Sequence, residues 1–248
     1  MTMGNTPMLD SPDYAFKINE QGKLLLYMPD DVFHPTGTTN ALIKAAAGYL
    51  DGPGRLLDLG CGSGVLGIAM HRLGLVAGDL CASDLSAAAI ACTQKNVAHH
   101  GCPADARCGS LFEPWEGEKF EIIIDDISGV AEEVAKASPW FHNVPCNSGP
   151  DGTTLVAEVI ARAADYLAPG GRFFFPVISF SNMDKLVGLA EEAFSHVERL
   201  EHQAWPLPEE MHEHEALLKE QRDMGHVTFE EKFGMILWFT EVYVAYNK

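Results

Sequence analysis

The 248-residue chain is short of basic residues and has no long apolar run. Seventeen Lys and Arg residues stand against 35 Asp and Glu residues, a net charge of −18. Because nucleic-acid binding draws most of its affinity from cationic contacts, a nucleic acid is a poor candidate for the partner. No apolar run reaches the length of about 20 residues that crosses a membrane. The chain is therefore expected to have no membrane partner.

The cysteines are also sparse and form no C-x-x-C pair. They are Cys61, Cys81, Cys92, Cys102, Cys108 and Cys146. This scatter favours reduced thiols in a cytoplasmic protein over a disulfide scaffold or a zinc site. Residues Met1 to Pro12 lack the basic stretch and apolar core of a signal peptide, which agrees with a cytoplasmic location.

Short apolar runs alternate with helical patterns along the chain, and this is typical of a doubly wound α/β fold. We expect a Rossmann-like, mainly parallel, seven-stranded sheet with its last strand antiparallel. The predicted sheet strands are 55–59, 81–84, 105–109, 120–125, 172–178, 196–205 and 235–246, and two further strands are 14–19 and 23–27. The predicted helices are 39–50, 65–73, 87–99, 129–137, 154–167 and 183–194.

The division expected from this pattern is an N-terminal cap and a core. Residues 1–50 form the β/helical cap with a segment that covers the site, and residues 51–248 form the core. A very polar stretch at about 209–232 separates the last two strands, so we expect a helical insertion there. It would serve as a lid or as the contact of a homodimer.

A glycine-rich loop, Asp58-Leu-Gly-Cys-Gly-Ser-Gly64, lies directly after one predicted strand and before a helix. Gly60 and Gly62 let the backbone turn sharply and approach a ligand, and Gly64 lets the helix pack against the sheet. The start of the helix offers free N–H groups to an anionic group. A glycine string alone could be only a tight turn, but its position favours a nucleotide site.

A second acidic residue strengthens this interpretation. Asp84 ends the next predicted strand, 26 residues after Asp58. A carboxylate at that place can accept hydrogen bonds from both hydroxyls of a ribose. The two features together predict a site for a ligand that contains a nucleoside.

The stretch Leu56-Leu-Asp-Leu-Gly-Cys-Gly-Ser-Gly-Val-Leu-Gly-Ile-Ala69 resembles the first motif of class I S-adenosylmethionine-dependent methyltransferases. The resemblance implies that S-adenosylmethionine is the cofactor and that its methionine carboxylate meets the helix start. It also places adenine beside Gly109-Ser-Leu-Phe112, where Ser110 replaces the usual Asp. The implied cofactor contacts are Thr36, Thr39, Asp58, Gly60, Cys61, Gly62, Gly64, Asp84, Leu85, Ser110, Leu111 and Asp126.

Residues 30 to 180 resemble a narrower branch, the small-domain methyltransferases. This branch includes the release-factor glutamine methyltransferases (HemK-like) and certain ribosomal RNA guanine methyltransferases. Val32-Phe-His-Pro-Thr-Gly-Thr-Thr39 is similar to the segment that closes over their cofactor, and Gly149-Pro-Asp-Gly152 is similar to their Gly-x-Asp-Gly turn. Where the branch carries Asn-Pro-Pro-Tyr after the fourth strand, this chain has Asp125-Asp-Ile-Ser-Gly129. The clamp for a planar nitrogen is therefore replaced.

Asp125 and Asp126 are the predicted catalytic residues, because they end a buried strand where doubly wound folds bind ligands. Either carboxylate can accept a hydrogen bond from an amine or hydroxyl, or act as a general base. The alternative is a structural role, as a helix N-cap or in a salt bridge.

Other side chains near the predicted site have open interpretations. His34 could be a base or simply a packed or solvated histidine. The aromatic loop of residues 138–145 could form a wall for the acceptor or belong to the core. His212 and His214 are two residues apart and do not share a helix face, so we expect no metal site.

The sequence therefore predicts a methyltransferase that acts on a nitrogen or oxygen atom of a small molecule. The resemblance to the HemK-like branch implies methylation of a protein side chain as the alternative. A cofactor-binding interaction subunit without turnover is a third hypothesis, because the clamp is altered.

Overall fold

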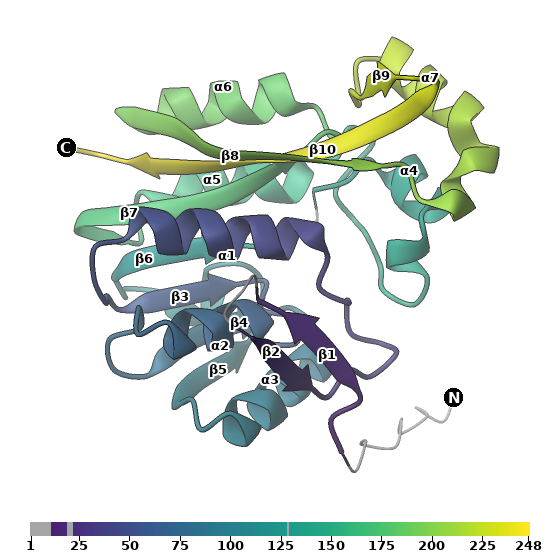
Figure 1. Ribbon diagram of the computed structural model, residues 1–248. Coiled ribbons are helices and arrows are strands. Elements are labelled where there is room, and N and C mark those ends of the chain that lie inside the picture. The colour runs from purple at the N-terminus through teal and green to yellow at the C-terminus, as the bar shows by residue number, and fades with distance from the viewer. Residues whose placement is uncertain (1–10, 19–21, 128) are drawn as a thin grey trace.

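The computed structural model describes residues 11–18, 22–127 and 129–248. Its centre is an eight-stranded sheet (Figure 1). Seven strands follow the order β5-β4-β3-β6-β7-β10-β8, and the eighth, β9, pairs with the first residues of β10. The strands are β3 (Leu56–Leu59), β4 (Leu80–Asp84), β5 (Ala104–Cys108), β6 (Phe120–Asp125), β7 (Leu167–Ile178), β8 (His196–Pro206), β9 (Glu230–Lys232) and β10 (Met235–Tyr246).

The strand directions match the predicted fold class. Strands β3 to β7 pair in parallel, whereas β10 runs antiparallel to both β7 and β8. The predicted Rossmann-like sheet with an antiparallel last strand is therefore confirmed, but it has eight strands and not the predicted seven, because β9 joins it. The insertion is helical only in part, because it contains β9 in addition to α7 (Glu215–Asp223). At Met235 to Leu237, the edge of β10 has unpaired backbone N–H and C=O groups, and pairing with β9 satisfies them.

Helices cover both faces of the sheet, as Figure 1 shows. One face carries α1 (Gly37–Tyr49), α2 (Val65–Arg72) and α3 (Ala87–His99), and the other carries α5 (Thr154–Ala163) and α6 (Met183–Ala193). The short helix α4 (Glu132–Ala137) follows β6. Phe173, Phe174 and Phe175 are all fully buried and alternate between the two cores, as expected for a strand covered on both faces.

The two N-terminal strands, β1 (Tyr14–Lys17) and β2 (Lys23–Leu26), form a separate antiparallel hairpin. The last residue of the predicted strand 14–19 and residues 1–10 lie outside the described residues. The hairpin is tied to the core by Asn96 of α3, whose Oδ1 accepts a hydrogen bond from the Tyr27 amide at 2.8 Å. Helix α1 packs against β7, β8 and β10, so it belongs to the layer over the core sheet.

The segment Ala168-Pro-Gly-Gly171 differs from the prediction. The predicted helix 154–167 and strand 172–178 leave this segment as the connection between them, but α5 ends at Ala163 and the segment lies within β7. The pairing of β6 with β7 jumps from Phe120–Leu167 to Ile122–Arg172, so the extra residues bulge out of the ladder. Gly170, with φ +77°, supplies the left-handed conformation that this bulge needs.

No helix in the described part of the chain is long and apolar enough to cross a membrane. All six cysteines are free. Four are buried, Cys146 is half-buried, and Cys108 at the end of β5 is exposed.

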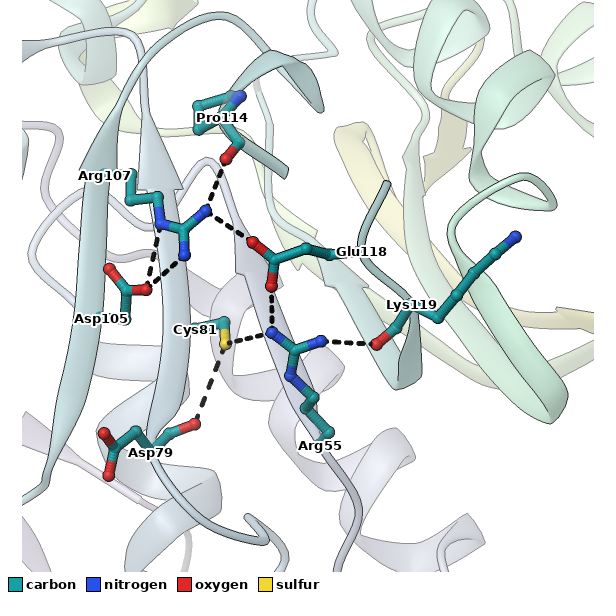
Figure 2. A network of polar contacts seen from close by, with 8 residues as sticks. All are labelled: Arg55, Asp79, Cys81, Asp105, Arg107, Pro114, Glu118 and Lys119. Atoms are coloured by element: carbon teal, nitrogen blue, oxygen red, sulfur yellow. Dashed lines mark hydrogen bonds and ion pairs between the residues drawn. The ribbon is translucent and has the colours of Figure 1, made fainter. Parts of the chain in front are cut away.

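A polar network lies at the amino edge of the sheet, away from the ends of the strands that carry the predicted site. Figure 2 shows Glu118 between two guanidinium groups, those of Arg55 and Arg107. Arg107 also binds Asp105 through Nη2 at 2.6 Å and lies 4.0 Å from the ring centre of Trp115. The two arginines hold the pKa of the Glu118 carboxyl below its usual value, because their hydrogen bonds favour the ionised form. The network links β3 and β5 with the loop before β6.

Glu118→Gln is expected to lower the free energy of unfolding by about 1–2 kcal/mol at pH 7, because both arginines lose a charged partner. The difference from wild type should shrink as the pH falls below about 4, where the glutamate itself becomes protonated. Urea unfolding at pH 7 and pH 3.5 measures this. An equal loss at both pH values would contradict the ionic role of Glu118.

Candidate functional site

A cavity of about 480 Å³ lies at the carboxyl edge of the sheet, where β3, β4 and β6 end. Parallel strands bring their carboxyl ends to one edge, so residues that follow different strands meet there. The segment before α1 and the loop after α4 complete the walls of the cavity. The site is therefore assembled from parts that are far apart in the sequence.

The glycine loop forms the floor between β3 and α2. The Gly60 and Cys61 amides donate to the Ser83 carbonyl at 2.9 and 3.0 Å, which locks the loop against β4. Gly60 has φ +73°, and a Cβ built on it would lie 2.5 Å from the Ile127 side chain. Only glycine fits this position without displacing β6 and its following loop.

Asp58 lies under the loop and does not line the cavity. Its buried Oδ2 accepts a hydrogen bond from the Gly67 amide at 2.9 Å, while Oδ1 has no partner among the described residues. Burial raises the pKa of this carboxyl to about 7. Gly64 also lies behind the wall, since a Cβ on it would meet Thr93 of α3 at 3.0 Å. Both residues shape the loop and do not face the cavity.

Asp84 does line the cavity, at the end of β4. Its two oxygens are oriented by backbone amides, because Oδ2 accepts from Gly62 at 2.9 Å and Oδ1 accepts from Ser86 at 2.8 Å. Each oxygen keeps a further lone pair for a ligand hydroxyl. The carboxylate is thus fixed in place beside the glycine loop.

Two leucines provide apolar surface at the same end of the cavity. The Leu85 side chain is 72% exposed although it is large and apolar. Leu111 adopts a left-handed backbone with φ +47°, which is strained for a leucine. Ser110 lines the cavity next to it. Backbone strain of the kind seen at Leu111 clusters at ligand sites.

The segment before α1 covers the other end of the cavity. Thr36 caps α1, and its neighbour Thr39 donates through Oγ1 to Asp126 Oδ2 at 2.8 Å. Thr38 bonds Thr240 of β10, with 2.8 Å between their hydroxyl oxygens. Phe33 contacts Phe141 with ring centres 5.1 Å apart. The covering segment is therefore joined to β6, β10 and the loop after α4.

Asp125 and Asp126 occupy different environments. Asp125 is completely buried and does not line the cavity, and its Oδ1 accepts from the Ile127 amide at 2.8 Å. Asp126 lines the cavity. Burial raises the pKa of each carboxyl to about 7. The hydrogen bond that each carboxyl accepts lowers the pKa, but by less than burial raises it. Asp126 is thus the member of the pair that can contact a ligand.

The predicted contacts divide clearly in the structure. Those that line the cavity are Thr36, Thr39, Gly60, Cys61, Gly62, Asp84, Leu85, Ser110, Leu111 and Asp126. Those that lie outside its wall are Asp58, Gly64 and Asp125. The roles of all of these residues in binding and catalysis stay predictions.

A second cavity of about 610 Å³ adjoins the first. Trp140 and Trp238 line both cavities, and Trp205 lines the second. Trp205 and Trp238 are not among the predicted site residues, and they pair across β8 and β10. Because β10 is antiparallel to β7, the first residues of β10 lie at the edge where β7 ends. Nothing local in the sequence marks the two tryptophans as neighbours. His34 lines only the second cavity, where it packs edge-on against Tyr14.

Among the described residues, no group of three or more His, Cys, Asp or Glu side chains could hold a metal ion.

Known proteins are similar to this chain in sequence. Residues 37–126 match the family model for the methyltransferase small domain. The release factor glutamine methyltransferase of Geobacter sulfurreducens is 28% identical over 148 residues, covering 56% of this chain and 51% of that protein. The ribosomal RNA small subunit methyltransferase C of Pasteurella multocida is 30% identical over 175 residues, covering 67% and 46%. The chain spans about half the length of the curated relatives it matches.

Solved structures show the same fold. The 16S rRNA N2 G1207 methyltransferase of T. thermophilus, in complex with AdoMet and guanosine, has a TM-score of 0.60 at 19% identity. The match covers 95% of this chain and 50% of that one. The ribosomal protein L11 methylase of Lactobacillus delbrueckii subsp. bulgaricus has a TM-score of 0.58 at 16% identity, covering 93% and 90%.

These comparisons confirm the predicted resemblance to the small-domain methyltransferases. The predicted small-molecule acceptor finds no support in them, because these relatives are named for protein or RNA acceptors.

Asp125→Asn tests how much folding free energy is lost when the buried Asp125 carboxyl ionises. The unfolded chain ionises Asp125 near pH 3.9, whereas the folded protein does so only at about pH 7, so wild-type stability falls as the pH rises between these values. The variant lacks this loss. Relative to wild type, it should therefore gain more than about 1 kcal/mol of unfolding free energy between pH 5 and pH 8.

Urea unfolding across this range measures the effect, and Asp79→Asn, at an exposed position, is the matched control. Parallel pH curves for wild type and Asp125→Asn would show that Asp125 is not a buried, protonated carboxyl.

Proposed function

We propose that this protein transfers a methyl group from S-adenosylmethionine to a nitrogen or oxygen atom of an acceptor. The observation that carries the proposal is the meeting of Asp84, the Gly60–Gly62 loop and Asp126 at one cavity. A carboxylate and a glycine loop suit the nucleoside end of the cofactor. A second carboxylate at the opposite wall suits a nucleophile that must lose a proton.

The residues present fit this cofactor. The fixed Asp84 carboxylate can accept from the ribose hydroxyls, and Leu85 and Leu111 can cover the faces of the adenine ring. Ser63 and Ser83 line the cavity, while their hydroxyl oxygens are buried and have no hydrogen-bond partner among the described residues. When bound, S-adenosylmethionine supplies an electrophilic methyl carbon on a positively charged sulfur.

Asp126 is the residue that we propose to handle the acceptor. Thr39 holds one of its oxygens, and the other has no hydrogen bond within the described residues. That oxygen can accept a hydrogen bond from the acceptor and align its lone pair with the methyl carbon. Because burial raises the pKa of Asp126 to about 7, the carboxylate can also take up a proton near neutral pH.

For the acceptor, we propose a protein side chain. The relatives include enzymes named for release factors and for ribosomal protein L11. The net charge of −18 opposes binding of an RNA backbone. Glutamine is not carried over, because Asp125 and Asp126 replace the Asn-Pro-Pro-Tyr clamp. A small molecule is the second candidate, since the adjoining cavity of about 610 Å³ could enclose one.

S-adenosylhomocysteine should bind the protein with micromolar affinity in calorimetry, whereas NAD should not bind. Asp84→Asn should weaken this binding by about 1–3 kcal/mol, because a ribose hydroxyl loses a charged acceptor. Asp51→Asn, an equal charge change on the surface, is the control. Binding of NAD alone would refute the cofactor, and unchanged affinity in Asp84→Asn would refute the ribose contact.

Asp126 should titrate near pH 7 in the free protein. Carbon-13 NMR of aspartate carboxyl groups measures this, and the signal is assigned by its loss in Asp126→Asn. That variant should lose methyl transfer by about a hundredfold, a larger effect than any change in its affinity for S-adenosylhomocysteine. A midpoint near pH 4 would exclude Asp126 as a base at neutral pH. A variant with full turnover would remove it from the reaction.

A further inference from the structure

The first cavity carries acidic side chains without a basic one to balance them. Asp31, Asp84 and Asp126 line it, and no described Lys, Arg or His residue does. Behind its wall lie two further carboxyls, those of Asp58 and Asp125, and both residues are fully buried. Because no cationic side chain offsets these carboxylates at the cavity, a positively charged ligand is attracted to it.

Asp58 and Asp126 are held on neighbouring strands at the same edge of the sheet. Asp58 belongs to β3, and the Asp126 amide donates to the Leu59 carbonyl at 3.1 Å, so Asp126 is fixed beside the next residue of that strand. Each carboxyl has one oxygen in a hydrogen bond, to Gly67 and to Thr39, and the other oxygen has no partner among the described residues. Half of each carboxyl is therefore free to respond to a nearby charge.

The two carboxyls influence each other through their charges. Burial raises the pKa of both to about 7, and the charges of Asp126 and Asp84 raise the pKa of Asp58 further. Ionising one of these groups makes it harder to ionise the next. A positive charge placed in the cavity would oppose this effect and favour the ionised forms.

We propose that Asp126, together with Asp58 beneath the glycine loop, makes the cavity distinguish the positively charged cofactor from its neutral product. The inference rests on the proposed methyl transfer and concerns the regulation of that same site. S-adenosylmethionine carries a positive charge on sulfur, S-adenosylhomocysteine does not, and otherwise they differ by one methyl group. A cation near Asp126 favours the carboxylate form, and the carboxylate in turn holds the cation. The neutral thioether gains neither attraction.

The other titratable groups around the cavity have different surroundings. Asp84 is held by two backbone amides, and Asp31 is exposed. Burial raises the pKa of the Cys61 thiol well above its usual value, so this group stays neutral. The charge of Asp125 raises the pKa of Asp126 further, but Asp125 itself does not line the cavity. Asp126 is thus the group that both faces a ligand and changes its charge near neutral pH.

The same change of charge accompanies methyl transfer. A bond forms between the acceptor atom and the methyl carbon, and the electron pair of the broken C–S bond stays on sulfur, where the positive charge disappears. The proton that the acceptor loses passes to Asp126 and then to solvent. Without the positive charge, Asp126 and Asp58 return to their protonated forms more readily and hold the product less tightly. The charge pair would therefore favour exchange of product for new cofactor.

Binding without turnover provides the first test. Calorimetry between pH 5.5 and pH 8 compares S-adenosylhomocysteine with S-adenosylmethionine and with sinefungin, which carries an ammonium group in place of the methylated sulfur. The affinity of each cation, divided by that of S-adenosylhomocysteine, should rise about threefold or more over this range, because Asp126 changes from protonated to ionised near pH 7. A ratio that does not change with pH would overturn the proposal.

Proton release provides an independent readout. At pH 6.5, calorimetry in two buffers of different ionisation enthalpy counts the protons released on binding. Both cations should release more protons than S-adenosylhomocysteine, because they lower the pKa of the carboxyls near them. Equal proton release for all three ligands would contradict the proposed coupling.

Variants assign the effect to its residues. Asp126→Asn should remove most of the pH dependence of the affinity ratio. Asp58→Asn should reduce it, although its amide oxygen can still accept from Gly67. The surface change Asp51→Asn is the matched control and should leave the ratio at its wild-type value at every pH. Urea unfolding shows which variants are folded, and if Asp58→Asn is not, Asp126→Asn decides alone. Wild-type pH dependence in Asp126→Asn would overturn the proposal.

The same measurements separate this inference from the proposed function. Micromolar binding of S-adenosylhomocysteine, with an affinity ratio that is the same at every pH, would refute the charge discrimination alone. Failure of all three ligands to bind would refute the proposed function itself.

Discussion

The hydrogen bond from the Gly67 amide to the buried Asp58 carboxylate fixes the turn from β3 into α2, and the rest of the site is positioned by that turn. It brings the first turn of α2 back against the end of β3, so the loop between them must project over the sheet edge. The Ser83 carbonyl then receives two loop amides, which aligns the loop with β4 and with Asp84. A change at Asp58 would therefore disturb the cavity without any direct contact with a ligand.

Much of the fold follows from local patterns in the sequence. Most helix and strand boundaries agree with expectation within about two residues, because apolar periodicity and caps such as Ser86 before α3 are local signals. The bulge at Ala168–Gly171 is different. A Pro-Gly-Gly stretch looks like a helix stop, and only the pairing of β7 with β6 and β10 makes it part of a strand. Tertiary pairing overrides local preference there.

The site divides in the same way. Residues in the glycine loop and at the end of β4 can be found from the sequence, because their position after a strand defines their place in the fold. Whether Asp58 or Asp125 faces the cavity cannot be read so directly, since one residue of register reverses a side chain between strand faces. Trp205 and Trp238 depend on the antiparallel pairing of β8 and β10, which joins segments more than 30 residues apart. Pairing between strands that are far apart in the chain is the feature that is hardest to predict from a single sequence.

The distribution of thiols has a practical and chemical consequence. Burial raises the pKa of Cys61, Cys81, Cys92 and Cys102, so these thiols have little thiolate character. Cys108 is the exposed one, and it stands two residues before Ser110 at the rim of the first cavity. Alkylating reagents should thus react first with Cys108. A fluorophore attached there would sit beside the binding site, so the protein carries its own attachment point for following ligand entry in real time.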